Sequence, residues 1–402
     1  MRTATTVEAS ALGSWFRQAD FVVEAEKLGL DICWVAEAWG SDAPSALGYY
    51  AARTQRMLLG SGVMQVGTRT PVALAQTAIT LSNLSGGRFL LGLGPSGPQV
   101  VEGLHGVPFA RPLARMRETV EIVRQVIAGG KVAYSGAEFT IPLPGGDAVP
   151  MRLSLRAEHP VPVYLAALSP AMLRLTGQVA DGWLGTSFVP EGAAQAYFAP
   201  LEEGLAAAGR ERAGFDVCQG AEVAFAPDEE ALAAMVAGRK KELAFSLGGM
   251  GSASTNFYNR AYSRQGWAEV AAQVRERWQG GDRDGAAELV TDEMVLATTL
   301  IGTEDMVRRR LRVWRDAGVD TVRLYPAGDT LDARLATLGR AIELVREVDA
   351  GSRRALTALG APGGRPGGCS AVPASDGHRA AERTGGRADE RTSGRGRTGA
   401  GA

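Results

Sequence analysis

The chain has 402 residues, of which 45% are hydrophobic and 22% are charged, so it can bury a large core and is neither mostly disordered nor fibrous. Its 43 basic and 44 acidic residues leave a formal net charge of -1, which argues against a general attraction to nucleic acid or anionic lipid. The length suggests two or three average domains, but a single (β/α)₈ barrel of roughly 250 residues or more also fits.

The cysteine and histidine content excludes further classes of protein. Cys33, Cys218 and Cys369 are odd in number and far apart, so neither a disulfide framework nor a structural zinc site is expected. With three histidines in the whole chain, no metal site is predicted. The sequence shows neither a signal peptide nor a transmembrane segment. We therefore expect a cytoplasmic enzyme that acts on a small-molecule substrate, without nucleic-acid or membrane partners; a homodimer stays open.

Composition changes sharply near Gly351. From there to Ala402 the chain is mostly Gly, Arg, Ala, Ser and Thr, and such a segment buries too little apolar surface to offset its ordering entropy. We predict a folded domain over residues 1–350 and a disordered, mildly basic Gly/Arg/Ala-rich tail over residues 351–402. Binding of nucleic acid by the tail is the less favoured alternative, because aromatic residues are not interleaved with its arginines.

Helix-like and strand-like patterns alternate before the tail. In chain order, the first half predicts a short polar strand at 3–7, a helix ending at 29, strands at 32–35 and 58–66, a helix from 70 to 84, a strand at 89–91 and a helix at 115–127. The second half predicts strands at 162–166, 183–184, 218–225 and 319–325, with helices starting at 169, 228, 303 and 331. The first strand is the least convincing of these elements.

Repeated βα units with buried apolar strands indicate a parallel sheet. About eight such units fit between residues 3 and 348, so we predict an α/β fold, a TIM (β/α)₈ barrel. Two stretches, 131–159 and 248–290, break the alternation. We expect both to be insertions over the C-terminal mouth of the barrel, the end at which active sites of this fold lie.

One glycine-rich motif, Gly92 to Gly97, is a literal G-x-G-x-x-G that follows a strand. A Rossmann helix should open within such a motif, but Pro95 and several later prolines and glycines break this region. A turn whose backbone approaches a ligand or phosphate is the preferred interpretation, and an ordinary tight βα turn is the alternative.

Polar residues at strand ends are the other candidates. Glu37 and Asp42 follow the second strand, where an acid can hydrogen-bond a ligand or move protons. For Asp42 a helix cap or an ion pair with an arginine is slightly preferred. Gln65 lies near the end of the third strand and could hydrogen-bond a heterocycle. His105 follows the glycine-rich turn and could face the mouth, although a lone histidine is more often structural.

The helix that begins at Ser169 and Pro170 could hold an anion at its N-terminus, or the serine could be a plain cap. Acid-base groups are few in this chain. Glycine-rich barrel mouths combined with this shortage suggest that an organic cofactor carries the chemistry.

Three segments carry a resemblance to a known family. Val35–Ala43, Leu91–Phe109 and Val163–Trp183 resemble the luciferase-like monooxygenase superfamily, and within it the coenzyme F420-dependent oxidoreductases, similar to methylenetetrahydromethanopterin reductase and F420-dependent glucose-6-phosphate dehydrogenase. Segments 248–251 and 256–259 add to this likeness, which covers about residues 15–348.

The resemblance implies a barrel of the bacterial luciferase-like type with a deazaflavin at its C-terminal mouth. It also implies a non-prolyl cis peptide, which matches Gly62–Val63, and an acid after the second strand, which matches Glu37. The family's other coenzyme contacts match Pro95, Ser96, Gly97, Ala167, Leu168, Ser169, Ala171 and Met172. Trp39 and Asp42, which follow the second strand with Glu37, are expected to face the substrate.

Two departures limit what can be transferred. The sugar-phosphate dehydrogenases have a catalytic histidine where this chain has Ala38, and they have a glutamate near the position of Gly97. Both residues are absent from this chain. Glu37 and His105 are therefore the expected catalytic acids. The preferred function is an F420-dependent oxidoreductase that moves hydride between the deazaflavin and a small organic substrate. The alternatives are an FMN-dependent monooxygenase of the same superfamily and a non-catalytic ligand-binding barrel.

Overall fold

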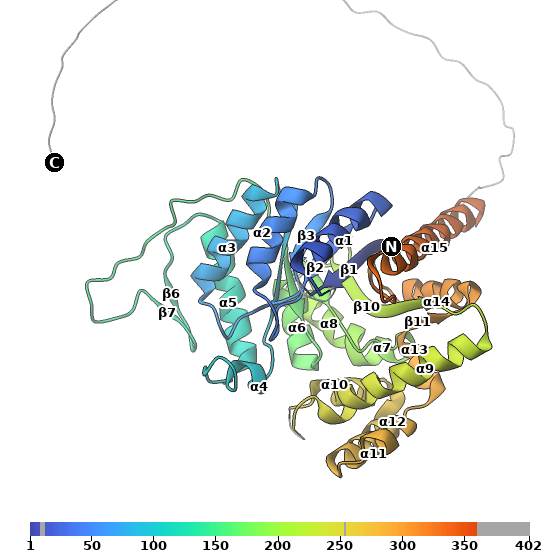
Figure 1. Ribbon diagram of the computed structural model, residues 1–402. Coiled ribbons are helices and arrows are strands. Elements are labelled where there is room, and N and C mark those ends of the chain that lie inside the picture. Colours follow the sequence, from blue (N-terminus) through green and yellow to red (C-terminus); the bar gives the residue numbers. More distant parts are fainter. Residues whose placement is uncertain (9–12, 253–254, 360–402) are drawn as a thin grey trace, which may run out of the picture. The chain divides into compact units, whose positions relative to one another are not determined.

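Eight parallel strands close into a barrel in this computed structural model (Figure 1), which describes residues 1–8, 13–252 and 255–359. Around the barrel they are β1 (Arg2–Val7), β2 (Ile32–Val35), β3 (Leu58–Ser61), β5 (Phe89–Gly94), β8 (Val163–Ala166), β9 (Gly182–Leu184), β10 (Asp216–Phe225) and β12 (Thr321–Pro326). Strand β12 pairs with β1 and closes the sheet. Two short strands, β4 (Met64–Gln65) and β11 (Leu300–Gly302), extend the pairing of β5 and β10 near their carboxyl ends.

Helices surround the barrel. Those that follow its strands are α1 (Trp15–Leu28), α2 (Ala43–Arg53), α3 (Pro71–Leu84), α4 (Pro98–Val101), α5 (Pro112–Ile127), α6 (Pro170–Val179), α7 (Pro190–Ala193), the π-helical η1 (Ala194–Phe198), α8 (Ala199–Ala207), α14 (Glu304–Asp316) and α15 (Leu331–Leu359). The predicted TIM barrel is therefore confirmed.

Local sequence signals set the helix ends as predicted. The hydroxyl oxygens of Thr70, Ser169 and Thr303 each accept a hydrogen bond from a backbone N–H in the first turn of α3, α6 and α14. The carboxylate of Asp228 accepts such a bond in the first turn of the helix that follows β10. Gly29 ends α1 with a φ of 88°, a left-handed conformation that favours glycine.

Strand β1 is a full member of the barrel, although its polar sequence made it the weakest expectation. It pairs with β12 on one side and β2 on the other. Its threonines are accommodated because strands suit β-branched residues and because Thr5 donates its hydroxyl proton to the carbonyl of Leu324 at 2.7 Å. The polar sequence of the first strand therefore gives no reason to expect a damaged barrel.

The inside of the barrel is filled by large side chains lying over glycines. The ring of Trp34 crosses β3, where a Cβ on Gly60 would lie 2.3 Å from it and a Cβ on Gly62 3.0 Å from its Cβ. Trp34 meets Tyr164 edge to face with ring centroids 5.1 Å apart. The barrel centre is thus a packed core, and ligands are confined to its rim.

The two predicted insertions lie in different places. Residues 248–290 belong to a longer helical insertion between β10 and β11: α9 (Glu229–Ala244), η2 (Phe245–Gly249), α10 (Phe257–Tyr262), η3 (Ser263–Trp267), α11 (Ala268–Gln279), α12 (Arg283–Glu288) and α13 (Asp292–Thr298). It follows a strand's carboxyl end, and Figure 1 shows α10–α12 at the same lower end of the barrel as α4.

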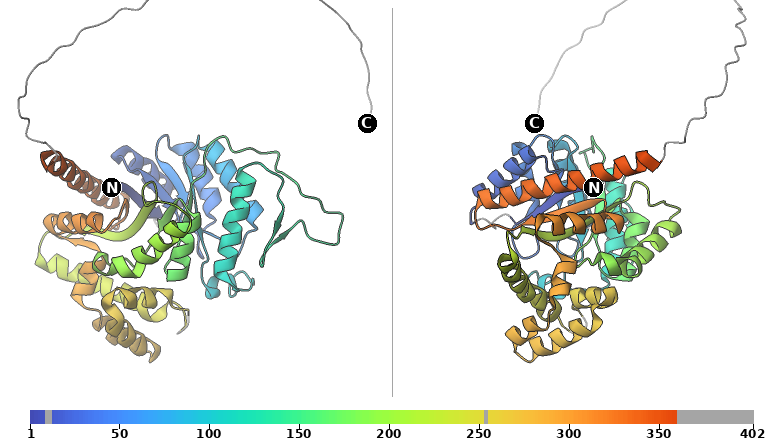
Figure 2. Two further views of the ribbon diagram at one scale, coloured as in Figure 1. Left: turned by 180° about the vertical axis from the view of Figure 1, so that it is seen from behind. Right: turned by 90° about the vertical axis from the view of Figure 1, so that its right-hand side faces the viewer.

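The first insertion was wrongly placed over the mouth. Residues 131–159 join the end of α5 to the start of β8, so they leave from and return to the amino-terminal side. Their hairpin, β6 (Tyr134–Ser135) with β7 (Thr140–Ile141), stands outside α5 (Figure 2). It is held there by Glu118 of α5, which accepts backbone N–H groups of residues 137–139 at 2.8–3.0 Å.

Helix α15 continues past the predicted domain boundary at residue 350, to Leu359. The rest of the predicted disordered tail lies outside the described residues. In the part of the chain that the structure covers, every helix is too short or too polar to span a lipid bilayer.

Candidate active site

The carboxyl ends of β2 and β4 and the loops that follow them bring Glu37, Gln65 and Arg69 together. Glu37, just after β2, is 8% exposed and receives both guanidinium nitrogens of Arg69, at 2.7 and 2.5 Å. Its oxygens also accept the backbone N–H groups of Gln65 at 3.2 Å and Ala43 at 3.4 Å. The hydrogen bonds to Glu37 raise the pKa of Arg69, against the opposing effect of burial. Glu37 is therefore a fully engaged carboxylate.

The general-acid role expected for Glu37 stays a prediction. An acid catalyst needs a proton at the reaction pH and a free path to the substrate. Glu37 lies in a bidentate pair with Arg69, which fixes the orientation of its carboxylate. Arg69 could not be identified as the partner from the sequence, because the two residues are 32 positions apart.

Asp42 has both of the alternative roles considered for it. Its carboxylate accepts the backbone N–H of Ser45 at 2.9 Å and caps α2, and it forms an ion pair with Arg69 at 2.7 Å. These contacts lower the pKa of Asp42, although partial burial opposes them. Trp39, the other residue expected to face substrate, is 67% exposed on the turn between β2 and α2.

Gln65 is the most informative of the predicted residues. It is 2% exposed, and its Nε2 donates to the carbonyl of Ala38 at 2.7 Å. Its Oε1 is buried without a hydrogen-bond partner among the residues that the structure describes. Because a carbonyl can accept only from the NH₂ side of the amide, the orientation of the group is fixed. A buried acceptor without a donor is costly, and a ligand N–H would satisfy it.

The peptide bond between Gly62 and Val63 is cis, as the resemblance implies. Val63 packs against the neighbouring strand, where a Cβ on Gly94 would lie 2.4 Å from its Cγ2 and 3.6 Å from the Cβ of Ala166. Gly62, Val63 and Ala166 are partly exposed. Gln65 pairs with Gly94, and β5 in turn pairs with β8, so Gly62, Val63, Gly94 and Ala166 form a patch of small groups next to Gln65. We call this patch the ledge.

The glycine-rich turn continues from the ledge. Pro95, Ser96 and Gly97 are partly exposed, and Ser96 has a φ of 60°, in the left-handed region. Gly97 precedes α4, a single short turn rather than the long helix of a dinucleotide fold. The rejection of a Rossmann site therefore agrees with the structure.

The second predicted contact segment lies at the start of α6. Ser169 caps this helix by accepting the backbone N–H of Met172 at 3.3 Å. Ala167 is buried and binds the indole N–H of Trp183 through its carbonyl, whereas Leu168 is partly exposed and Ala171 is exposed. The carbonyl of Leu168 also receives Arg264, from the helical insertion.

His105 is exposed just beyond α4. Its backbone N–H closes the short helix on Val100 at 3.1 Å. The role of His105 as a catalytic acid stays a prediction.

A polar half of the mouth was missed by sequence reasoning. Glu222 on β10 and Tyr325 on β12 are paired in register, and they border a cavity of about 460 Å³ with Thr6 and Arg239. Arg239 of α9 lies 3.4 Å from Glu222. Burial raises the pKa of Glu222, although the charge of Arg239 opposes this. The phenol ring of Tyr325 lies over Gly220, where a Cβ would be 2.3 Å from the phenol oxygen.

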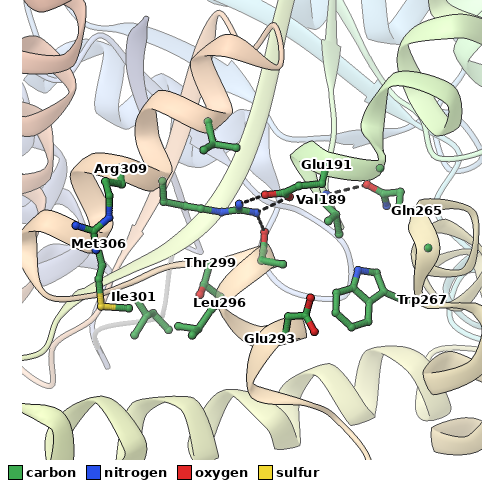
Figure 3. Close-up of a pocket in the computed structure, with 15 residues that line it drawn as sticks. Val189, Glu191, Gln265, Trp267, Glu293, Leu296, Thr299, Ile301, Met306 and Arg309 are labelled. Atoms are coloured by element: carbon green, nitrogen blue, oxygen red, sulfur yellow. Dashed lines mark hydrogen bonds and ion pairs between the residues drawn. The ribbon is translucent and has the colours of Figure 1, made fainter.

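A larger cavity of about 1030 Å³ lies elsewhere, between α7, α13, β11, α14 and η3. Figure 3 shows Arg309 and Trp267 on opposite sides of it and Glu191 at its edge. Glu191 is paired with Arg310, a neighbour on α14. Among the described residues, none of the predicted site residues borders either cavity. Cavity size therefore does not identify the site. The ledge is chosen instead because the unpartnered acceptor belongs to Gln65, next to it.

Comparison with known proteins identifies the family. Residues 2–321 match the family model described as luciferase-like monooxygenase. The chain belongs to this family. The eight-stranded barrel, the cis peptide and the family match agree, and the resemblance seen in the sequence is confirmed.

Three relatives carry names that belong to the coenzyme F420-dependent branch. A protein of Mycobacterium tuberculosis, whose name assigns it provisionally as a coenzyme F420-dependent oxidoreductase, is 41% identical over 80% of this chain and 95% of its own. The 5,10-methylenetetrahydromethanopterin reductase of Archaeoglobus fulgidus is 29% identical over 80% of this chain and 93% of its own. The solved coenzyme F420-dependent tetrahydromethanopterin reductase of Methanopyrus kandleri superposes with a TM-score of 0.69 at 26% identity, covering 86% of this chain and 96% of that one.

Proposed function

We propose that this chain is a coenzyme F420-dependent oxidoreductase that transfers a hydride between the deazaflavin and a small organic substrate. The names of its relatives support the coenzyme class. The structural observation that carries the proposal is the ledge with the unpartnered Oε1 of Gln65 beside it.

The ledge fits a deazaflavin for two reasons. A deazaflavin is planar, so its face can lie on small groups such as Gly62, Val63 and Ala166, which leave space above the strand ends. Its pyrimidine portion carries an N–H, and Gln65 offers a buried acceptor for such a donor. When bound, the coenzyme supplies hydride transfer, and the residues of this chain bind and orient it.

The phosphate-bearing tail is assigned to the two neighbouring segments. Backbone N–H groups at Ser96 and Gly97, and those of Ser169 and Ala171 at the start of α6, would hold it. The N-terminus of a helix of this length favours negative charge. The substrate would then occupy the half of the mouth bordered by Glu222 and Tyr325, and Glu37 would orient the coenzyme side without donating a proton.

Native mass spectrometry of the purified protein with coenzyme F420, FMN and NADPH, added separately, tests the proposal. We expect F420 to bind with micromolar or better affinity and FMN more weakly. Tight FMN binding without F420 binding would favour the monooxygenase, and binding of none of them would favour a non-catalytic barrel. A cytoplasmic location and a homodimer stay predictions of the sequence.

The variant Glu37→Gln separates the two roles of Glu37, because it keeps the shape but weakens the pair with Arg69. We expect coenzyme affinity to fall while kcat at saturating coenzyme is kept. A large loss of kcat with unchanged affinity would restore the acid role.

A further inference from the structure

Arg69 is the residue through which the carboxyl rim is organised. It lies on the loop between β4 and α3 and contacts the loop between β2 and α2 at two residues. Its guanidinium binds both oxygens of Glu37 and one oxygen of Asp42. Glu37 in turn accepts the backbone N–H of Gln65 at 3.2 Å. A continuous path of hydrogen bonds therefore runs from Arg69 through Glu37 to Gln65.

The same path fixes the side chain of Gln65 from its other end. Nε2 of Gln65 binds the carbonyl of Ala38, a residue with a φ of 39° on the loop that also carries Glu37. The backbone of Gln65 is held by Glu37 and its amide nitrogen by the neighbouring residue. The one group of Gln65 left without a partner among the described residues is Oε1.

We propose that Arg69 is a positioning residue for the coenzyme site, acting through Glu37 to aim the carbonyl of Gln65 at the ligand. The inference rests on the proposed function, since it names what sets up the ledge for a ligand N–H. Arg69 does not itself contact the coenzyme in this proposal. An arginine suits the task because its planar fork binds two carboxylates in fixed directions, which a lysine cannot do.

The chain contains a matched control at the opposite end of the barrel. Arg88 is also a partly buried arginine that joins loops, and it donates to the carbonyls of Ala51, Thr54, Met57 and Ser85 at 2.9–3.1 Å. Its contacts lie around the start of β3, on the amino-terminal side. Loss of Arg88 should loosen the fold without reaching the ledge.

The test compares Arg69→Met, Arg69→Lys and Arg88→Met in the full-length protein. Dissociation constants for F420 are measured by quenching of coenzyme fluorescence, below the melting temperature of every variant. We expect Arg69→Met to weaken F420 binding at least tenfold, Arg69→Lys to restore part of the loss, and Arg88→Met to stay within twofold of the wild type. A tenfold change corresponds to about 1.4 kcal/mol.

A merely structural role for Arg69 gives a different result. If Arg69→Met binds F420 within twofold of the wild type, or if both methionine variants weaken binding in proportion to their lost stability, the proposal is overturned.

Hydrogen exchange separates this failure from a failure of the proposed function. If the wild type does not bind F420, the proposed function fails, but the exchange rate of the Gln65 backbone amide can still be measured without ligand. Arg69→Met should speed that exchange at least tenfold, and Arg88→Met should leave it close to the wild-type rate. Equal exchange in Arg69→Met and the wild type would refute the positioning path itself.

Discussion

Two buried glutamates lie at opposite ends of the same barrel. Glu26, at the end of α1, is 9% exposed and accepts three consecutive backbone N–H groups, of residues 55–57, at 2.7–2.9 Å. Glu37, at the other end, is equally buried and binds Arg69. Each glutamate has an arginine nearby, yet the contacts of Glu26 end on the connection into β3, whereas those of Glu37 lead to an unpartnered acceptor. The same residue types thus stabilise a loop at one rim and prepare a ligand site at the other.

The largest effect is expected at the amino-terminal rim. Glu26→Ala leaves the backbone N–H groups of residues 55–57 without their acceptor, and because the donor at Met57 is buried, this should cost roughly 2–3 kcal/mol of unfolding free energy. Urea denaturation measures the loss, and F420 affinity should stay unchanged. Glu24→Ala on the exposed face of α1 is the control, with an expected loss below about 0.5 kcal/mol. A loss below about 1 kcal/mol for Glu26→Ala would contradict this assignment.

Gly94→Ala tests the ledge by steric means. The added Cβ would lie 2.4 Å from Cγ2 of Val63, so Val63 must move, at a cost of roughly 1–3 kcal/mol. F420 affinity should fall with it, because the ledge is displaced. Gly130→Ala, where a Cβ meets nothing within 4 Å, should change neither stability nor affinity appreciably. Unchanged F420 binding in Gly94→Ala would remove the ledge from the coenzyme site.

Gln65→Leu should separate binding from stability. It removes the bond to Ala38 but also an unpartnered buried acceptor, so the unfolding free energy should change by less than about 1 kcal/mol. F420 binding should weaken about tenfold, because the ligand loses its acceptor. Calorimetry and fluorescence titration measure the two quantities, with Gln76→Leu on the exposed side of α3 as the control. Equal F420 affinity in both variants would argue that Gln65 is structural.

The smallest expected effect is a difference in acid sensitivity. Burial raises the pKa of Glu26, but the three backbone N–H donors and the charge of Arg88 outweigh it and lower the pKa overall. Its stabilising contribution is therefore present above the unfolded-state pKa of about 4.3 and is lost as the pH falls below it.

Stability curves between pH 5 and 3 measure this contribution. Glu26→Gln should flatten the curve relative to the wild type. Asp42→Asn should flatten it less, because the pKa of Asp42 is also lowered but its side chain is 49% exposed and screened by solvent. A steeper loss for Glu26→Gln than for the wild type would reverse the sign of this argument.

Much of the fold could be predicted because its signals are local. The caps at Thr70, Ser169 and Thr303, and the stop at Gly29, depend on side-chain oxygens or backbone freedom within a few residues. The insertion at 131–159 was misplaced because composition shows that a segment breaks the alternation but not at which end of the barrel it leaves. The extent of helix α2 was not predicted, although Asp42 was considered as the cap of the helix that follows it.

The sequence by itself determined the barrel and the likeness to luciferase-like proteins, and that likeness implied the position of the cis peptide. The barrel depends on hydrophobic period and turn chemistry, and the likeness depends on contiguous motifs. Only the tertiary structure decided that Glu37 is paired with Arg69, that Oε1 of Gln65 has no partner among the described residues, and that Glu222 and Tyr325 share one cavity. The physical reason is that parallel strands bring residues far apart in sequence to one rim, where the electrostatic role of a side chain is set by neighbours that no local pattern reveals.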